Sequence, residues 1–190
     1  MATSDVAICN LALLKIGHDD PISELTDETK AARLSRRFYE PMRDAVLRAH
    51  PWNFALGRAN LAADPTTPAF EWAYAFTLPN DFLRLVQLWD TQIPFVIEGN
   101  QLLTNSETCK LKYVKKVTDP NRFDSIFIDV LATRIAINLA IPMAQDPELY
   151  ERLTKSYRDA LIEARFTDAS EGKGPTYPDD TGWFEARGSE

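Results

Sequence analysis

The sequence predicts an α+β protein: a bundle of about four helices with an inserted small antiparallel β-meander and an extended C-terminal arm. Three observations predict this class. Apolar residues recur at helical spacing in two stretches near each end, the middle alternates with the period of a strand, and the last residues are rich in glycine, proline and charge. The length of 190 residues and the 45% hydrophobic content suit one domain with an appendage.

The first helix is expected at residues 4–16. Ser4 can accept a hydrogen bond from the free amides of the first turn, and Asp5 favours the positive end of the helix. Gly17 supplies the left-handed residue that commonly closes a helix. The spacing of apolar residues therefore has a matching start and stop.

The second helix is expected at residues 27–49 and has two contrasting faces. Pro41 predicts a kink or a break inside it, and His50 followed by Pro51 predicts its end. Trp52 is expected to fold back onto the core, together with Phe54. The expected apolar arc comprises Leu34, Phe38, Met42, Ala45, Val46 and Ala49, and the opposite arc, here called the basic face, comprises Lys30, Arg33, Arg36, Arg37, Arg43 and Arg48.

The β insertion is expected at about residues 70–117. Trp72, Tyr74 and Phe76 alternate with smaller residues, which is typical of an extended segment with one buried face. Further strands are predicted at 82–89, at 95–97 leading through a hairpin turn at 98–101, and at 110–117.

Two helices are expected to return after the insertion, at 124–141 and 147–165. The first is apolar almost all round, which is typical of the central helix of a core. Asp146 is a suitable N-cap for the second, with Pro147 at its first position. We expect a domain at 1–166 and an extended arm at 167–190.

Catalytic chemistry has no support in the sequence. The two histidines, His18 and His50, lack metal-ligand spacing, and Cys9 and Cys109 are too isolated for a disulfide framework or a zinc site. No glycine-rich phosphate-binding loop and no G-x-S-x-G motif occurs. No run approaches the about 18–20 consecutive apolar residues that a membrane helix needs. We therefore expect no catalytic residue, no metal, no cofactor, no enzymatic activity and no membrane partner.

The distribution of charge suggests contacts between copies. The net charge of −7 argues against a protein that coats nucleic acid. Residues 1–29 and 168–190 are acidic, whereas residues 30–60 are basic. Three interpretations of the basic face stay open: it pairs with an acidic segment of a neighbouring subunit, it contacts DNA phosphates, or it is a solvated surface.

The arm carries aromatic residues where the chain has no core of its own. Exposed aromatic side chains often anchor interfaces. The alternative is that Trp183 folds back onto its own domain. The expected partner-binding residues, toward a portal protein or a neighbouring subunit, are Tyr177, Trp183, Phe184 and Arg187.

Four segments in order, CNLALLKIG, FYEPMRDAVLRAHPWNFA, WAYAFTLPNDFLRL and a final WFEAR, resemble the head-to-tail adaptors of tailed bacteriophages. The resemblance is to the tail tubular protein A, or gatekeeper-like, group. It implies a structural virion protein, made in the host cytoplasm and located at the head-tail junction. It also implies a dodecameric ring that binds the portal protein and a tail or nozzle protein and lets double-stranded DNA pass non-specifically through its lumen during DNA ejection. The alternative function is a DNA-binding accessory protein that uses the basic face.

Overall fold

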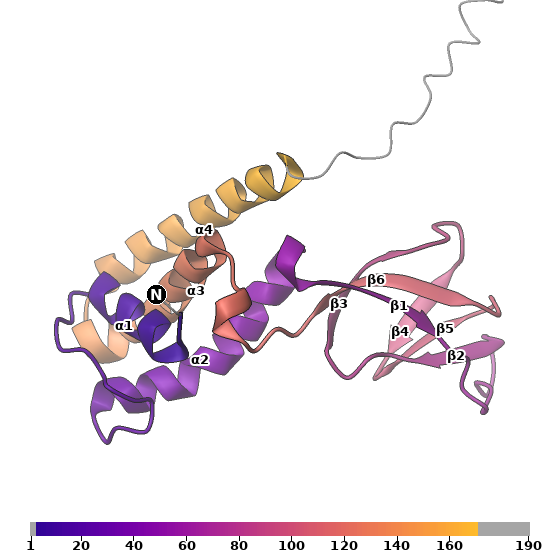
Figure 1. Cartoon of the computed structure of the whole chain (residues 1–190), viewed down its shortest axis with the longest axis horizontal. Coiled ribbons are helices and arrows are strands. Elements are labelled where there is room, and N and C mark those ends of the chain that lie inside the picture. Colours follow the sequence, from indigo (N-terminus) through magenta and orange to yellow (C-terminus); the bar gives the residue numbers. More distant parts are fainter. Residues whose placement is uncertain (1–2, 171–190) are drawn as a thin grey trace, which may run out of the picture.

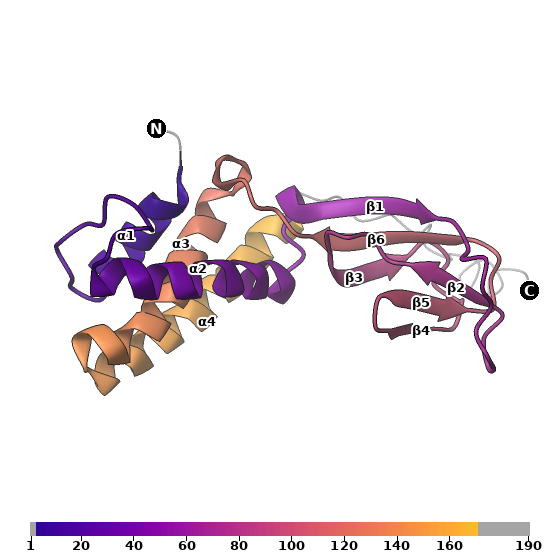
Figure 2. The same ribbon diagram turned by 90° about the horizontal axis from the view of Figure 1, so that it is seen from below.

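A computed structural model, which describes residues 3–170, shows two parts that lie end to end (Figure 1). A helical part contains both chain ends of the described region, and a β part extends from the C-terminal end of its second helix. A view turned by 90° shows the same separation (Figure 2). The predicted α+β class is confirmed at this level, with four α-helices and two small antiparallel sheets within residues 3–170.

The helical part begins with α1 (Asp5–Lys15), which the Ser4 side chain caps by accepting from the Ala7 amide at 3.1 Å. Thr29 caps the second helix, so α2 spans Lys30–Ala49 and starts three residues later than predicted. Pro41 lies inside α2 without breaking it.

The other two helices follow the β part. The third is α3 (Ser125–Leu139), which continues as a π-helical segment, η3 (Ala140–Ala144), past the predicted end at 141. The fourth is α4 (Pro147–Ser170). Its predicted end at residue 165 is wrong, and the helix crosses the expected boundary between domain and arm.

Helix α3 is the centre of the helical part, as its apolar composition predicts. It packs against α1, α2 and α4, and Phe127, Leu131 and Ile135 are fully buried. By length and composition alone, residues Ser125–Ala144 are also apolar enough to span a membrane, yet more than half of that window is buried inside the protein. Because this segment is buried, its apolar composition is that of a core helix.

The β part differs from the expected meander, because it forms two three-stranded antiparallel sheets with strand orders β1-β6-β3 and β2-β5-β4. Among strands that follow one another along the chain, only β4 and β5 are hydrogen-bonded to each other, as a hairpin. A strand that the sequence did not predict, β1 at Leu56–Leu61, precedes the expected start at 70. The remaining strands are β2 (Tyr74–Thr77), β3 (Phe82–Leu88), β4 (Phe95–Glu98), β5 (Gln101–Thr104) and β6 (Cys109–Lys115).

Each part has its own hydrophobic core. The smaller core lies between the two sheets, where Phe76 and Leu102 from one sheet meet Leu111 from the other. In the larger core, Trp52 folds back as expected: its indole nitrogen donates to the Val46 carbonyl at 3.0 Å. The two cores adjoin each other, because Val114 of β6 belongs to the larger one and Leu83 and Val86 of β3 pack against it.

Candidate functional site

The basic face is the first candidate, and the structure changes its membership. Arg43 is buried, with 3% of its surface exposed, so its assignment to an exposed intersubunit or DNA-facing surface is wrong. The other five members are exposed on α2: Lys30, Arg33, Arg36, Arg37 and Arg48.

Arg43 is buried because the inward side of α2 is rotated from the predicted arc. At about 100° per residue, position 43 lies only about 40° around the helix from Tyr39. Tyr39 and Val46 are both buried, whereas Ala45, which was expected to face the core, is exposed. The guanidinium of Arg43 therefore lies on the buried side of the helix.

Most of the exposed basic side chains are bound to carbonyl oxygens of their own chain. Arg33 donates to the Glu28 carbonyl at 2.9 Å, and Arg36 donates to the Leu25 carbonyl at 3.4 Å. The amino group of Lys30 and the guanidinium of Arg48 likewise donate to the carbonyls of Pro142 and Leu83. Arg37 makes no hydrogen bond or ion pair with residues 3–170 in the structure. Much of the face thus fastens neighbouring segments to α2.

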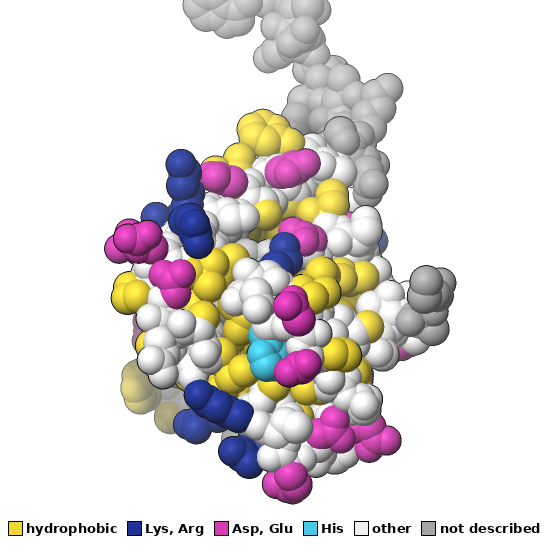
Figure 3. All heavy atoms as spheres, turned by 90° about the vertical axis from the view of Figure 1, so that its left-hand side faces the viewer, with side chains coloured by type: hydrophobic (Ala, Val, Ile, Leu, Met, Phe, Trp, Pro, Cys, Tyr) yellow, Lys and Arg dark blue, Asp and Glu magenta, His cyan; other side chains and the backbone are white. Residues whose placement is uncertain are grey.

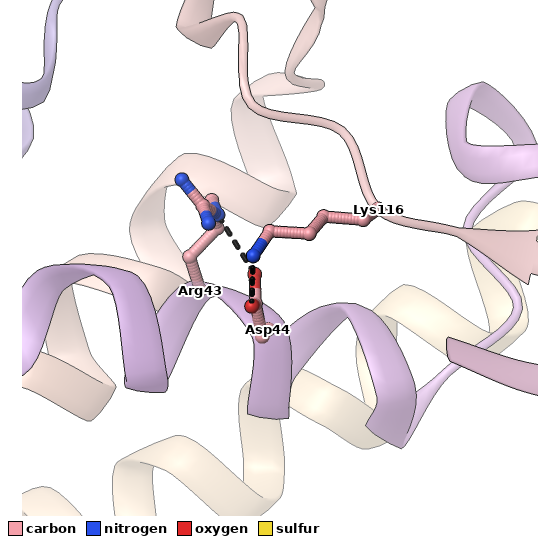
Figure 4. A network of polar contacts seen from close by, with 3 residues as sticks. All are labelled: Arg43, Asp44 and Lys116. Atoms are coloured by element: carbon pink, nitrogen blue, oxygen red, sulfur yellow. Dashed lines mark hydrogen bonds and ion pairs between the residues drawn. The ribbon is translucent and has the colours of Figure 1, made fainter. Parts of the chain in front are cut away.

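A chain of charged contacts joins α2 to the segment that follows β6 (Figure 4). Arg43 Nε donates to Asp44 Oδ1 at 2.9 Å, and Lys116 Nζ lies 2.9 Å from Asp44 Oδ2. The Arg43 guanidinium also lies 5.9 Å from the centre of the Tyr39 ring. A single carboxylate thus binds one buried and one partly exposed cation, at the place where the helical part meets the β part.

A groove of about 600 Å³ lies beside this chain of contacts, between the start of α1, the middle of α2 and the segment before α3. Tyr39 and Arg43 both line it. Burial, and then the charge of Asp5, raise the pKa of the Tyr39 phenol, while Arg43 acts in the opposite direction. The phenol is therefore neutral at physiological pH and keeps a proton to donate. The other residues that line the groove are Thr3, Ser4, Asp5, Leu25, Arg36, Glu40, Thr118, Pro120 and Asn121.

Large hydrophobic side chains are exposed on both parts of the molecule. In the β part, Phe70 is 80% and Trp89 is 82% exposed. In the helical part, Phe166 on α4 is 74% exposed. The end of the helical part seen in Figure 3 shows hydrophobic side chains between acidic and basic ones. The further members of this set are Leu14, Phe95, Ile97, Ile141, Tyr150 and Ile162.

The predicted anchors of the arm, Tyr177, Trp183, Phe184 and Arg187, lie outside the described residues. Within residues 3–170 no group of three or more metal-ligating side chains occurs. The two cysteines are buried, and burial raises the pKa of the Cys9 thiol to about 12 and also raises that of Cys109. Both thiols are therefore protonated at neutral pH and are poor nucleophiles.

The sequence predicted neither the groove nor the exposed aromatic residues of the β part. The sequence did contain a signal for the exposed aromatic residues: Phe70 follows a loop rich in proline and threonine, and Trp89 directly precedes a polar loop. For the groove there was no such signal, since an arginine and a tyrosine four residues apart on a helix are common. Compared with protein-family models and with curated protein sequences, the chain matches none.

Proposed function

We propose that this chain is a structural subunit of a phage virion, which assembles into a ring between the portal and the tail and lets double-stranded DNA pass. The sequence resemblance to head-to-tail adaptors supports a dodecameric ring. It also supports contacts of the helical part with the portal protein and of the β part with a tail or nozzle protein.

One structural observation carries the proposal. Two parts, each with a hydrophobic core, lie end to end, and each exposes large hydrophobic side chains, notably Phe166 on the helical part and Phe70 on the β part. Exposed apolar side chains that gather on a surface mark sites of protein contact. A subunit that joins two different partners needs two contact surfaces at a distance from each other, and Phe166 and Phe70 belong to different parts of this elongated chain.

The alternative, a DNA-binding accessory protein, is the less favoured function. Phosphate contacts require lysine and arginine side chains that are free to replace counterions. Arg43 is buried, and Lys30, Arg33 and Arg48 each donate to a carbonyl of the chain itself. Binding to duplex DNA at low salt, lost when Arg33, Arg36 and Arg37 are replaced by alanine, would favour this alternative.

The test is sedimentation of the full chain with and without the portal ring encoded by the same genome. The proposal predicts stoichiometric binding and assembly of subunits on the portal. Phe166→Ser and Phe70→Ser form a matched pair, because both side chains are mostly exposed and neither substitution removes a core contact. We expect Phe166→Ser to weaken portal binding and Phe70→Ser to leave it unchanged. A folded wild-type chain that does not bind the portal overturns the proposal.

A further inference from the structure

Two buried polar groups that line the groove lack a partner. The Tyr39 hydroxyl and Arg43 Nη2 make no hydrogen bond with residues 3–170, although the two side chains are only 5% and 3% exposed. Buried polar groups in native proteins are normally hydrogen-bonded, because leaving one unpaired is costly. Two such groups, one helical turn apart on α2 and both at the same groove, indicate a site that a ligand completes.

The two groups define the chemistry of the ligand. A guanidinium nitrogen can only donate, and the neutral phenol has a proton to donate, so the missing partner is an acceptor oxygen. Hydrogen bonds that pair an arginine with a carboxylate are stronger than neutral ones. The guanidinium is held in place, since its Nε donates to Asp44, which Lys116 also binds.

The groove also limits the class of ligand. Its volume of about 600 Å³ is far larger than a carboxylate group and is typical of a site for a larger ligand. Two basic residues, Arg36 and Arg43, are balanced by two acidic ones, Asp5 and Glu40. The groove therefore has no excess of positive charge to attract anions in general, and recognition of a ligand depends on the direction in which Tyr39 and Arg43 donate.

We infer that this groove binds the carboxylate of an organic ligand larger than acetate, with one carboxylate oxygen accepting from both Tyr39 and Arg43 Nη2. The two donor atoms are closed off from solvent in the unliganded chain. Entry requires a small rearrangement of the groove wall, and Arg36 is suited to move because it is exposed and its one hydrogen bond, to the Leu25 carbonyl, is long at 3.4 Å. This inference stands independently of the proposed ring.

The test follows the Arg43 Nε–H signal by nuclear magnetic resonance in the full ¹⁵N-labelled chain. The probe is aspartate with an acetylated amino group and an N-methylamide, and the comparison probes are the equivalent asparagine compound and acetate. We expect a saturable shift with the aspartate probe and a dissociation constant about tenfold lower than with either comparison probe.

Variants separate the site from its surroundings. Tyr39→Phe removes one donor and keeps the ring, so we expect about tenfold weaker binding of the aspartate probe. Arg37→Gln is the matched control, because Arg37 lies on the same helix but does not line the groove. We expect this variant to bind the aspartate probe with the affinity of the wild type. No saturable shift up to about 50 mM overturns the inference. Equal affinities for the aspartate and asparagine probes overturn the carboxylate, and equal affinities for the aspartate probe and acetate overturn the larger ligand.

Discussion

Replacing Asp44 by asparagine tests the charged contacts at the junction of the two parts. The substitution keeps the size of the side chain but removes the charge that Arg43 and Lys116 share. Breaking a fully buried ion pair from one side costs about 3–5 kcal/mol, because the remaining charge stays buried. Arg43 is buried, but the Asp44 side chain is 28% exposed, so water can partly replace the lost contact. We therefore expect a loss of about 2–3 kcal/mol in the free energy of unfolding.

The measurement is thermal and urea unfolding at neutral pH, followed by circular dichroism. For a chain of this length, that loss lowers the midpoint temperature by about 4–12 °C. Asp129→Asn is the matched control, since Asp129 forms an ion pair with Lys15 on the surface and its loss costs less than about 1 kcal/mol. If Asp44→Asn is no more destabilising than Asp129→Asn, the buried charge is solvated by another route and the reasoning is wrong. Adding Arg43→Met to Asp44→Asn is expected to recover part of the loss.

Three further predictions concern the cores. Gly57→Ala places a methyl group 2.9 Å from the ring of Tyr113, which Phe82 stacks against and Asp81 holds by a hydrogen bond, so urea unfolding should show a loss of about 1–3 kcal/mol. The thiols of Cys9 and Cys109 should react with a disulfide reagent far more slowly in the native chain than in urea, and fast reaction of both in the native chain would contradict their burial. Burial and the bond to Asp81 raise the pKa of Tyr113 from 10.0 to about 12, so its contribution to stability is complete below pH 10 and is lost as the pH rises toward 12. Tyr113→Phe should flatten that part of the pH profile, and an unchanged profile would count against the shift.

The helices were predictable where local signals and burial agree. Ser4 caps α1 and the all-round apolar α3 is central, and both follow from residues within the element itself. The inward side of α2 was not predictable in the same way. Its most buried positions include Ser35 and Arg43, and a polar residue is assigned to the surface by any rule based on hydropathy. The burial of Arg43 depends on Asp44 and on a lysine 73 positions later, which no local pattern contains.

Most strands of the β part were predictable from the sequence, but β1 and the arrangement into two sheets were not. The strand β1 pairs along its whole length with β6, from Leu56 opposite Val114 to Leu61 opposite Cys109. Its sequence, LGRANL, contains a glycine and an asparagine, both of which are unfavourable in strands. Pairing with a distant strand overrides that local preference, and the same pairing replaces a meander with two sheets that enclose a common core.

The pairing of β1 with β6 also has a consequence for how the chain folds. Helices α2 and α3 pack together, yet about 75 residues separate them along the chain. Once Leu56 and Val114 are paired, the loop that remains to be closed is only about 18 residues long. Loop-closure entropy grows with the logarithm of loop length, so this shortening favours the docking of the two helices by about 1 kcal/mol. Pairing of β1 with β6 thus brings the two halves of the helical bundle close to each other along the chain, and a substitution that weakens this pairing is expected to slow assembly of the helical core.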